Sequence, residues 1–246
     1  MESNRPLPLA RIFLLSHMRA YTSLVGHLLG SHPEINGYYE MHLSYASTTD
    51  LEEQLRRYAA HDRLKPGGRY LFDKLLHNDY ALDLAACDPH PTQVLIALRP
   101  PESTLKSIVS LFARKAVSDP YADPVGATTY YIERLQWLAG FAARHAERYR
   151  YFDAALICTA PTRTLAALGD WLQLGSPLQP RYQTFAKTGI AGAGDTSSAM
   201  AAGEVIRTAS DYAEITLDAA SLARAQQVYD DCRQQLIKHA AASFTD

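Results

Sequence analysis

Polar residues suited to holding an anion lie between the first apolar run of the chain and the helix pattern that follows it. Arg19 stands in this segment, and Thr22 and Ser23 fall where the N-cap of that helix belongs. A helix N-terminus carries N–H groups without intrahelical partners and a partial positive charge. Together with two hydroxyls and a forked guanidinium, it favours a phosphate or sulfate cradle. The same residues also fit an ordinary capped helix whose arginine lies in solvent.

A second pair with phosphate-binding chemistry occurs about eighty positions later. Arg99 follows the apolar run 93–98, and Ser107 comes eight residues after Arg99 in a predicted helix that begins near Pro101. Ligands of α/β proteins bind at the carboxyl ends of strands, where Arg99 is expected, and two helical turns let Ser107 face the same crevice. The alternative is an ion pair between Arg99 and Glu102, with Ser107 in solvent.

Hydrophobic periodicity predicts the elements that position these residues. Strands are expected over 11–15, 69–75, 93–98 and 150–157. Helices are expected from about 22 to 30, over 50–60, from 101 to about 115, and over 127–147, 161–173 and 217–241, with a turn at 65–68 and a loop at 118–126. Strands alternate with helices, which predicts an α/β fold with a mainly parallel central sheet.

The segment 186–203 is rich in small residues, and three of its glycines fall within six positions. This composition predicts a mobile or ligand-shaped loop that is too short to link two domains. The chain of 246 residues is therefore expected to form a single domain over 1–246.

Composition excludes several classes of function. Hydrophobic residues make up 47% and charged residues 20%, as in ordinary soluble proteins, and the formal charge of -2 leaves no general basic surface for nucleic acid. There is no apolar run long enough for membrane insertion and no signal-peptide pattern at the start, so a cytoplasmic protein is expected. The three cysteines suit a reducing compartment and match no zinc pattern, so no metal is expected.

Taken together, the two groups of residues resemble the PAPS-dependent sulfotransferases, in particular bacterial enzymes of the carbohydrate or small-molecule type. Their first loop commonly carries a basic residue, two neighbouring hydroxyls and a leucine, with a His-Pro pair some ten residues later. Arg19, Thr22, Ser23 and Leu24 match that loop, and the pair at 32–33 matches His-Pro. The resemblance covers most of the chain and thins after about residue 175.

The resemblance implies a P-loop-like three-layer fold with helices on both sides of the sheet. It implies PAPS (3′-phosphoadenosine 5′-phosphosulfate) as the sulfuryl donor, no metal, and a small-molecule or carbohydrate acceptor. The loop that includes Ala20 and Tyr21 would hold the donor, and Arg99 with Ser107 would bind its 3′-phosphate. Met18, Ala20 and Tyr21 stand where the family has proline, serine and glycine.

The resemblance also implies catalytic residues. Lys74, at the end of the second predicted strand, would lie near donor and acceptor. Glu40 is the expected base, with His42 in reserve; on an extended segment both side chains would point the same way. In the late loop, Lys187, Gly192 and Gly194 are expected to close over the nucleotide.

Two other functions remain open at this point. A P-loop-type nucleotide kinase is disfavoured because the Walker A lysine is missing from the first loop. A non-catalytic nucleotide-binding protein of sulfotransferase type stays possible because of the substitutions at Ala20 and Tyr21.

Overall fold

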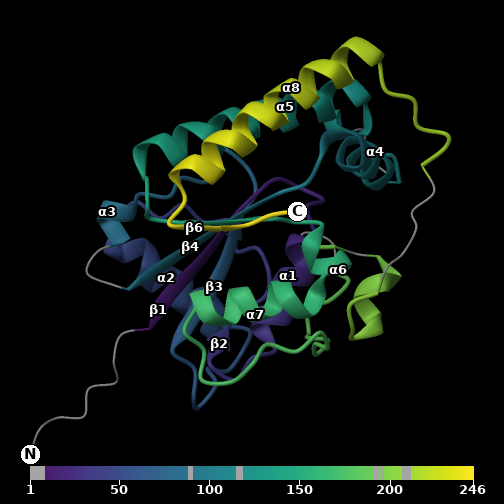
Figure 1. Ribbon diagram of the computed structural model, residues 1–246. Coiled ribbons are helices and arrows are strands. Elements are labelled where there is room, and N and C mark those ends of the chain that lie inside the picture. Colours follow the sequence, from purple (N-terminus) through teal and green to yellow (C-terminus); the bar gives the residue numbers. More distant parts are fainter. Residues whose placement is uncertain (1–8, 88–90, 115–118, 191–193, 196, 207–211) are drawn as a thin grey trace, which may run out of the picture.

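Six strands form one sheet in the order β2-β3-β1-β4-β5-β6, and every neighbouring pair is parallel (Figure 1). The computed structural model describes residues 9–87, 91–114, 119–190, 194–195, 197–206 and 212–246. The strands are β1 Ala10–Leu15, β2 Ile35–Asn36, β3 Tyr70–Leu75, β4 Thr92–Leu98, β5 Arg150–Asp153 and β6 Ala242–Phe244. The prediction of a mainly parallel sheet is confirmed.

Helices cover both faces of this sheet. The α-helices are α1 Thr22–Gly30, α2 Thr48–Ala59, α3 Leu84–Cys87, α4 Pro101–Phe112, α5 Pro124–Arg144, α6 Leu156–Thr159, α7 Pro161–Trp171 and α8 Ala219–His239; η1 Pro120–Ala122 and η2 Ser198–Ala202 are 3₁₀ turns. Figure 1 shows α5 and α8 side by side on one face, with α1 and α7 on the other. The chain therefore has the expected three layers.

The alternation of side chains along β1 explains the two faces. Phe13 and Leu15 pack in a core with residues of α4, α5 and α8, whereas Ile12 and Leu14 pack in a second core with α1, α6 and α7. Successive strand residues point to opposite sides of a sheet, so an unbroken apolar run is needed when both sides are covered. The run IFLL in β1 meets this need.

Several element boundaries differ from the prediction. The predicted strand 150–157 ends at Asp153, because the chain turns into α6 there. The long helix starts at Pro124 rather than 127, since Asp123 caps it by accepting a hydrogen bond from the Val125 N–H. The helix expected to reach about 115 ends at Phe112. β2, β6, α3 and α6 have two to four residues each and were not predicted.

The path of the chain creates a crevice beside β1. From β1 the chain runs to β2 and β3 on one side, then crosses to β4 on the other side. The strand order therefore reverses between β1 and β4, and ligands of open α/β sheets bind outside the carboxyl ends of the strands at such a switch point. Arg19 follows β1 and Arg99 follows β4, so both lie at this crevice.

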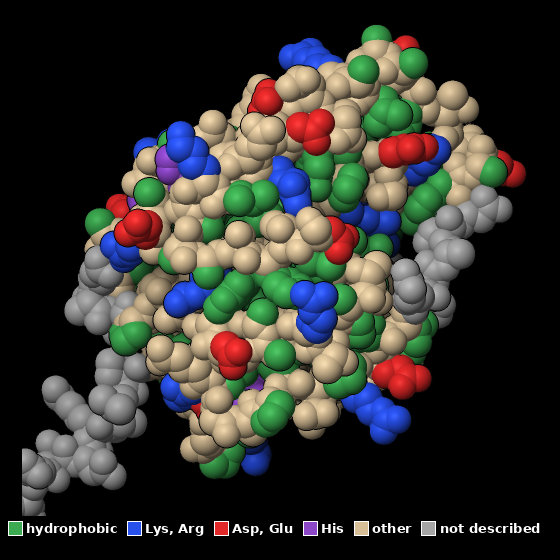
Figure 2. Space-filling model, viewed as in Figure 1, with side chains coloured by type: hydrophobic (Ala, Val, Ile, Leu, Met, Phe, Trp, Pro, Cys, Tyr) green, Lys and Arg blue, Asp and Glu red, His purple; other side chains and the backbone are tan. Residues whose placement is uncertain are grey.

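The surface carries charges of both signs. Figure 2 shows Lys and Arg interspersed with Asp and Glu among the described residues of this face, without a wide basic area. Within the described ranges, none of the helices is sufficiently long and apolar to traverse a bilayer.

Candidate functional site

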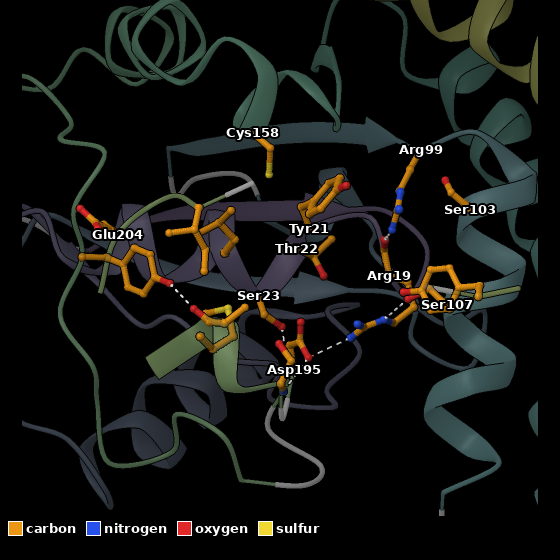
Figure 3. Close-up of a pocket in the computed structure, with 17 residues that line it drawn as sticks. Arg19, Tyr21, Thr22, Ser23, Arg99, Ser103, Ser107, Cys158, Asp195 and Glu204 are labelled. Atoms are coloured by element: carbon orange, nitrogen blue, oxygen red, sulfur yellow. Dashed lines mark hydrogen bonds and ion pairs between the residues drawn. The ribbon is translucent and has the colours of Figure 1, made fainter. Parts of the chain in front are cut away.

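A cavity of about 380 Å³ opens at the switch point (Figure 3). Its lining includes all the predicted anion-binding side chains of the two loops except that of Ala20, which is fully buried. These lining residues are Arg19, Tyr21, Thr22, Ser23, Arg99 and Ser107. The fold therefore joins two groups of residues that are about eighty positions apart in the sequence.

The loop before α1 reaches the cavity through an unusual backbone path. Arg19 and Tyr21 have φ values of 64° and 56°, although neither is glycine. Tyr21 is the N-cap of α1 and makes no side-chain cap, so the prediction that Thr22 or Ser23 is the cap is wrong. Both hydroxyl residues instead occupy the first turn of α1, where the N–H groups lack intrahelical partners. The residues that carry these N–H groups line the cavity.

The two arginines converge on one side of the cavity. The Arg19 Nε donates a hydrogen bond of 2.8 Å to Ser107 Oγ, and the Arg99 Nη1 donates one of 2.9 Å to the Arg19 carbonyl. The Arg99 guanidinium also stacks on the Tyr21 ring, 4.6 Å from its centroid. Arg99 does not pair with Glu102, whose carboxylate contacts Lys106 instead. The second predicted pair is thus part of the same cluster as the first.

His17, which was not predicted, connects the two loops. Its Nδ1 lies 2.9 Å from the Met18 carbonyl, so Nδ1 carries the proton, and Nε2 accepts the Arg99 N–H at 3.1 Å. Complete burial lowers the pKa of His17 to about 3, which keeps the ring neutral. A fixed neutral tautomer holds the end of β4 against the loop after β1.

Lys74 lies near the end of β3, as predicted, and reaches the start of α1. Its side chain is buried, and its Nζ donates a hydrogen bond of 3.1 Å to Ser23 Oγ. Burial lowers the pKa of Lys74, and the nearby carboxylates of Glu40, Asp73 and Asp195 oppose this effect. A buried lysine thus adjoins the N-terminus of α1.

Glu40 and His42 lie together, but the segment is not extended. His42 has a φ of 54°, so the condition for the two side chains to point the same way, an extended segment, is not met. The Glu40 Oε1 is 3.7 Å from His42 Nε2, and it is buried without a hydrogen-bond partner among the described residues. The Glu40 side chain is 8% exposed and that of His42 41%. Neither residue lines the 380 Å³ cavity, and Lys74, whose pKa burial lowers and the Glu40 charge raises, contacts it only through its hydrogen bond to Ser23.

Asp73 holds this segment against β3 and was also not predicted. Its Oδ1 accepts hydrogen bonds from the Met41 and Lys74 N–H groups at 2.9 and 2.8 Å, and its Oδ2 accepts one from the Tyr45 hydroxyl at 2.5 Å. Complete burial raises the pKa of Asp73 to about 7. One carboxyl therefore joins the candidate base to the strand that carries Lys74.

The late loop only partly matches the expectation. The Lys187 ammonium lies 3.8 Å from the centroid of the Tyr39 ring, outside the cavity lining, so the structure does not bring it to the two arginines. Gly194 has a φ of 148°, and a Cβ there would come within 2.8 Å of Ser23 Oγ, so the position requires glycine. Gly192 lies outside the described residues.

Asp195 is a further cavity residue that the sequence did not reveal. Its Oδ1 is 3.0 Å from the Arg19 Nη1, and its N–H donates to Ser23 Oγ at 2.9 Å. Arg19 keeps the pKa of this carboxyl low despite its burial. Within the described ranges, no three His, Cys, Asp or Glu side chains are grouped to hold a metal ion.

Comparison with known proteins defines the fold. No protein-family model matches the chain, and no curated protein does. Among solved structures, the sulfotransferase domain from the curacin biosynthetic pathway is similar, with a TM-score of 0.58 and 14% identity over 91% of this chain and 98% of that one. The chain therefore has the P-loop-like fold of a sulfotransferase domain.

Two structures of retinol dehydratase match more weakly. The complex with retinol and PAP has a TM-score of 0.46 and 15% identity, covering 92% of this chain and 82% of that one. The complex with androsterone and inactive cofactor PAP has a TM-score of 0.37 and 15% identity, covering 70% and 62%.

Proposed function

We propose that this protein is a PAPS-dependent sulfotransferase that moves a sulfuryl group to a hydroxyl or amine of a small-molecule or carbohydrate acceptor. The observation that carries the proposal is the convergence of Arg19, Arg99, Ser107 and the N-terminus of α1 on one cavity. Its position at the switch point of a sulfotransferase fold supports the same conclusion.

PAPS has two anionic ends, and the cavity offers two groups of hydrogen-bond donors. Arg19, Ser23 and the first N–H groups of α1 would hold the 5′-phosphosulfate, close to Lys74. Arg99 and Ser107 would hold the 3′-phosphate, since a guanidinium and a hydroxyl form strong charge-assisted hydrogen bonds with phosphate. The volume of about 380 Å³ falls in the range usual for small-molecule sites.

The reaction is an in-line displacement at sulfur. The acceptor oxygen or nitrogen forms a bond to sulfur while the bond from sulfur to the 5′-phosphate oxygen breaks, and 3′,5′-phosphoadenosine leaves. Negative charge develops on that bridging oxygen, where Lys74 and Arg19 stabilise it. The acceptor proton passes to Glu40, whose Oε1 has no hydrogen-bond partner among the described residues, with His42 as the alternative base.

The direct test is transfer of ³⁵S from labelled PAPS to a fractionated extract of small hydroxyl and amine compounds, read by mass spectrometry of the labelled product. Wild-type protein should label an acceptor, and Glu40→Gln is the matched inactive control because it keeps the size of the side chain. A parallel reaction with γ-labelled ATP tests the kinase alternative. Transfer from ATP, but not from PAPS, would overturn the proposal.

A further inference from the structure

Tyr21 adopts a backbone conformation that its side chain makes unfavourable. Its φ and ψ of 56° and 18° are left-handed, a region that glycine occupies readily and that a Cβ atom disfavours. Tyr21 also makes no side-chain cap to α1. When an aromatic residue occupies such a position, its side chain is expected to make an interaction that glycine could not make.

The contact that the ring makes is with Arg99. The guanidinium carbon of Arg99 lies 4.6 Å from the centroid of the Tyr21 ring, and Figure 3 shows the two side chains together at the cavity wall. Such stacking attracts a cation to the negative face of the ring. The Tyr21 ring therefore limits the directions in which the guanidinium can turn.

Other contacts fix the rest of Arg99. Its N–H donates to His17 Nε2, and its carbonyl accepts a hydrogen bond of 2.8 Å from the Tyr131 hydroxyl. Of its guanidinium nitrogens, only Nη1 donates a hydrogen bond to a described residue, the Arg19 carbonyl at 2.9 Å. No described residue accepts from the remaining guanidinium N–H groups, so they are available to a ligand in the cavity. Tyr21 fixes the orientation of the guanidinium plane and thus the direction of these N–H groups.

We propose that Tyr21 is a positioning residue that sets the preference of the cavity for a nucleotide with a 3′-phosphate, because it orients Arg99 before the ligand arrives. This inference rests on the proposed function, in which Arg99 receives that phosphate. A side chain already held in its bound orientation loses less freedom on binding. The affinity gained in this way applies to the 3′-phosphate and not to the 5′ end of the nucleotide.

The test measures by calorimetry the dissociation constants of 3′,5′-phosphoadenosine and AMP for wild type, Tyr21→Phe, Tyr21→Leu and Tyr21→Gly. The ratio that is compared is the dissociation constant of AMP divided by that of 3′,5′-phosphoadenosine. Phenylalanine keeps the ring and should keep the ratio within about twofold. Leucine and glycine lack the ring and should lower the ratio about tenfold, mainly by weakening 3′,5′-phosphoadenosine. Glycine also relieves the backbone conformation, so loss of the ratio in Tyr21→Gly does not depend on strain at this position.

A double-mutant cycle identifies the route of the effect. If Tyr21 acts through Arg99, then Tyr21→Leu should change the ratio no further in an Arg99→Ala background. A wild-type ratio near one would refute the proposed function itself. A high wild-type ratio that survives in Tyr21→Leu, or an equal loss of affinity for both nucleotides, would leave that function standing and overturn the role of Tyr21.

Discussion

The carboxylate of Asp195 lies 3.0 Å from the guanidinium of Arg19, inside the cavity that we propose for the donor. The same guanidinium hydrogen-bonds Ser107, and the backbone N–H of Asp195 donates to Ser23. An anionic side chain of the protein thus contacts the groups that would receive the anionic end of the donor. Donor and Asp195 should therefore compete for Arg19.

Replacing Asp195 by asparagine should tighten the binding of 3′,5′-phosphoadenosine. The substitution removes a negative charge from the cavity and releases Arg19, and we expect a gain of about three- to tenfold from one like-charge contact. Calorimetry would measure it, with Asp170→Asn as the control, because Asp170 is exposed on α7 and outside the cavity lining. Weaker binding in Asp195→Asn would mean that Asp195 orients Arg19 for the donor instead of competing with it.

Glu40→Gln should slow sulfuryl transfer by about 10²- to 10⁴-fold, the usual contribution of general-base catalysis. Donor affinity should stay within about twofold, because Glu40 does not line the 380 Å³ cavity. His42→Ala should cost less, since His42 is more exposed and contacts Glu40 from the solvent side. Single-turnover transfer and donor binding would be measured for both variants. Fast transfer by Glu40→Gln with slow transfer by His42→Ala would exchange the two roles.

The stability of the protein should depend on pH through Asp73. Burial raises its folded-state pKa to about 7, far above the ordinary value of 3.8, so the folded protein holds this proton more tightly than the unfolded chain does. The resulting stabilisation is fully present below about pH 4 and is lost as the pH rises through about 7, with an upper bound of about 4 kcal/mol.

Urea unfolding of wild type and Asp73→Asn at several pH values would measure this contribution. The free energy of unfolding of wild type should fall relative to that of the variant between about pH 4 and 7, and the difference should be constant above that range. Parallel profiles for the two proteins would show that Asp73 is ionised throughout.

Transfer should survive removal of divalent metal ions. In the proposed mechanism, the positive charge at the bridging oxygen would come from Arg19, from Lys74 and from the N–H groups of α1, all of which belong to the chain. Activity after treatment with EDTA should therefore match activity before it. Complete loss with EDTA and recovery with Mg²⁺ would instead favour the kinase alternative.

The sequence located residues of the candidate site best where the signal was local. Arg19, Thr22 and Ser23 adjoin a strand and a helix start, and Arg99 and Ser107 keep a fixed spacing, so motif and periodicity located both groups. The apolar runs of β1, β3 and β4 are long enough to be recognised, whereas β2 and β6, with two and three residues, are too short to show a period.

The residues that the sequence missed act through partners far along the chain. His17 accepts a hydrogen bond from Arg99, and Asp195 contacts Arg19, so neither has a local pattern. A histidine two residues after the end of a buried strand was the one available signal for His17. For Lys187, the stacking of its ammonium on the Tyr39 ring determines its place, and that contact joins positions 148 residues apart.

The most direct test of this account is the calorimetric affinity of the wild-type protein for 3′,5′-phosphoadenosine compared with that for AMP. A charge-assisted site for the 3′-phosphate contributes about 1.5–3 kcal/mol, so 3′,5′-phosphoadenosine should bind about 10- to 100-fold more tightly. Arg99→Ala should abolish this preference, whereas Arg163→Ala, which removes a positive charge on α7 outside the cavity lining, should keep it. Equal affinity of the wild-type protein for the two nucleotides would contradict the assignment of the cavity to a 3′-phosphorylated donor.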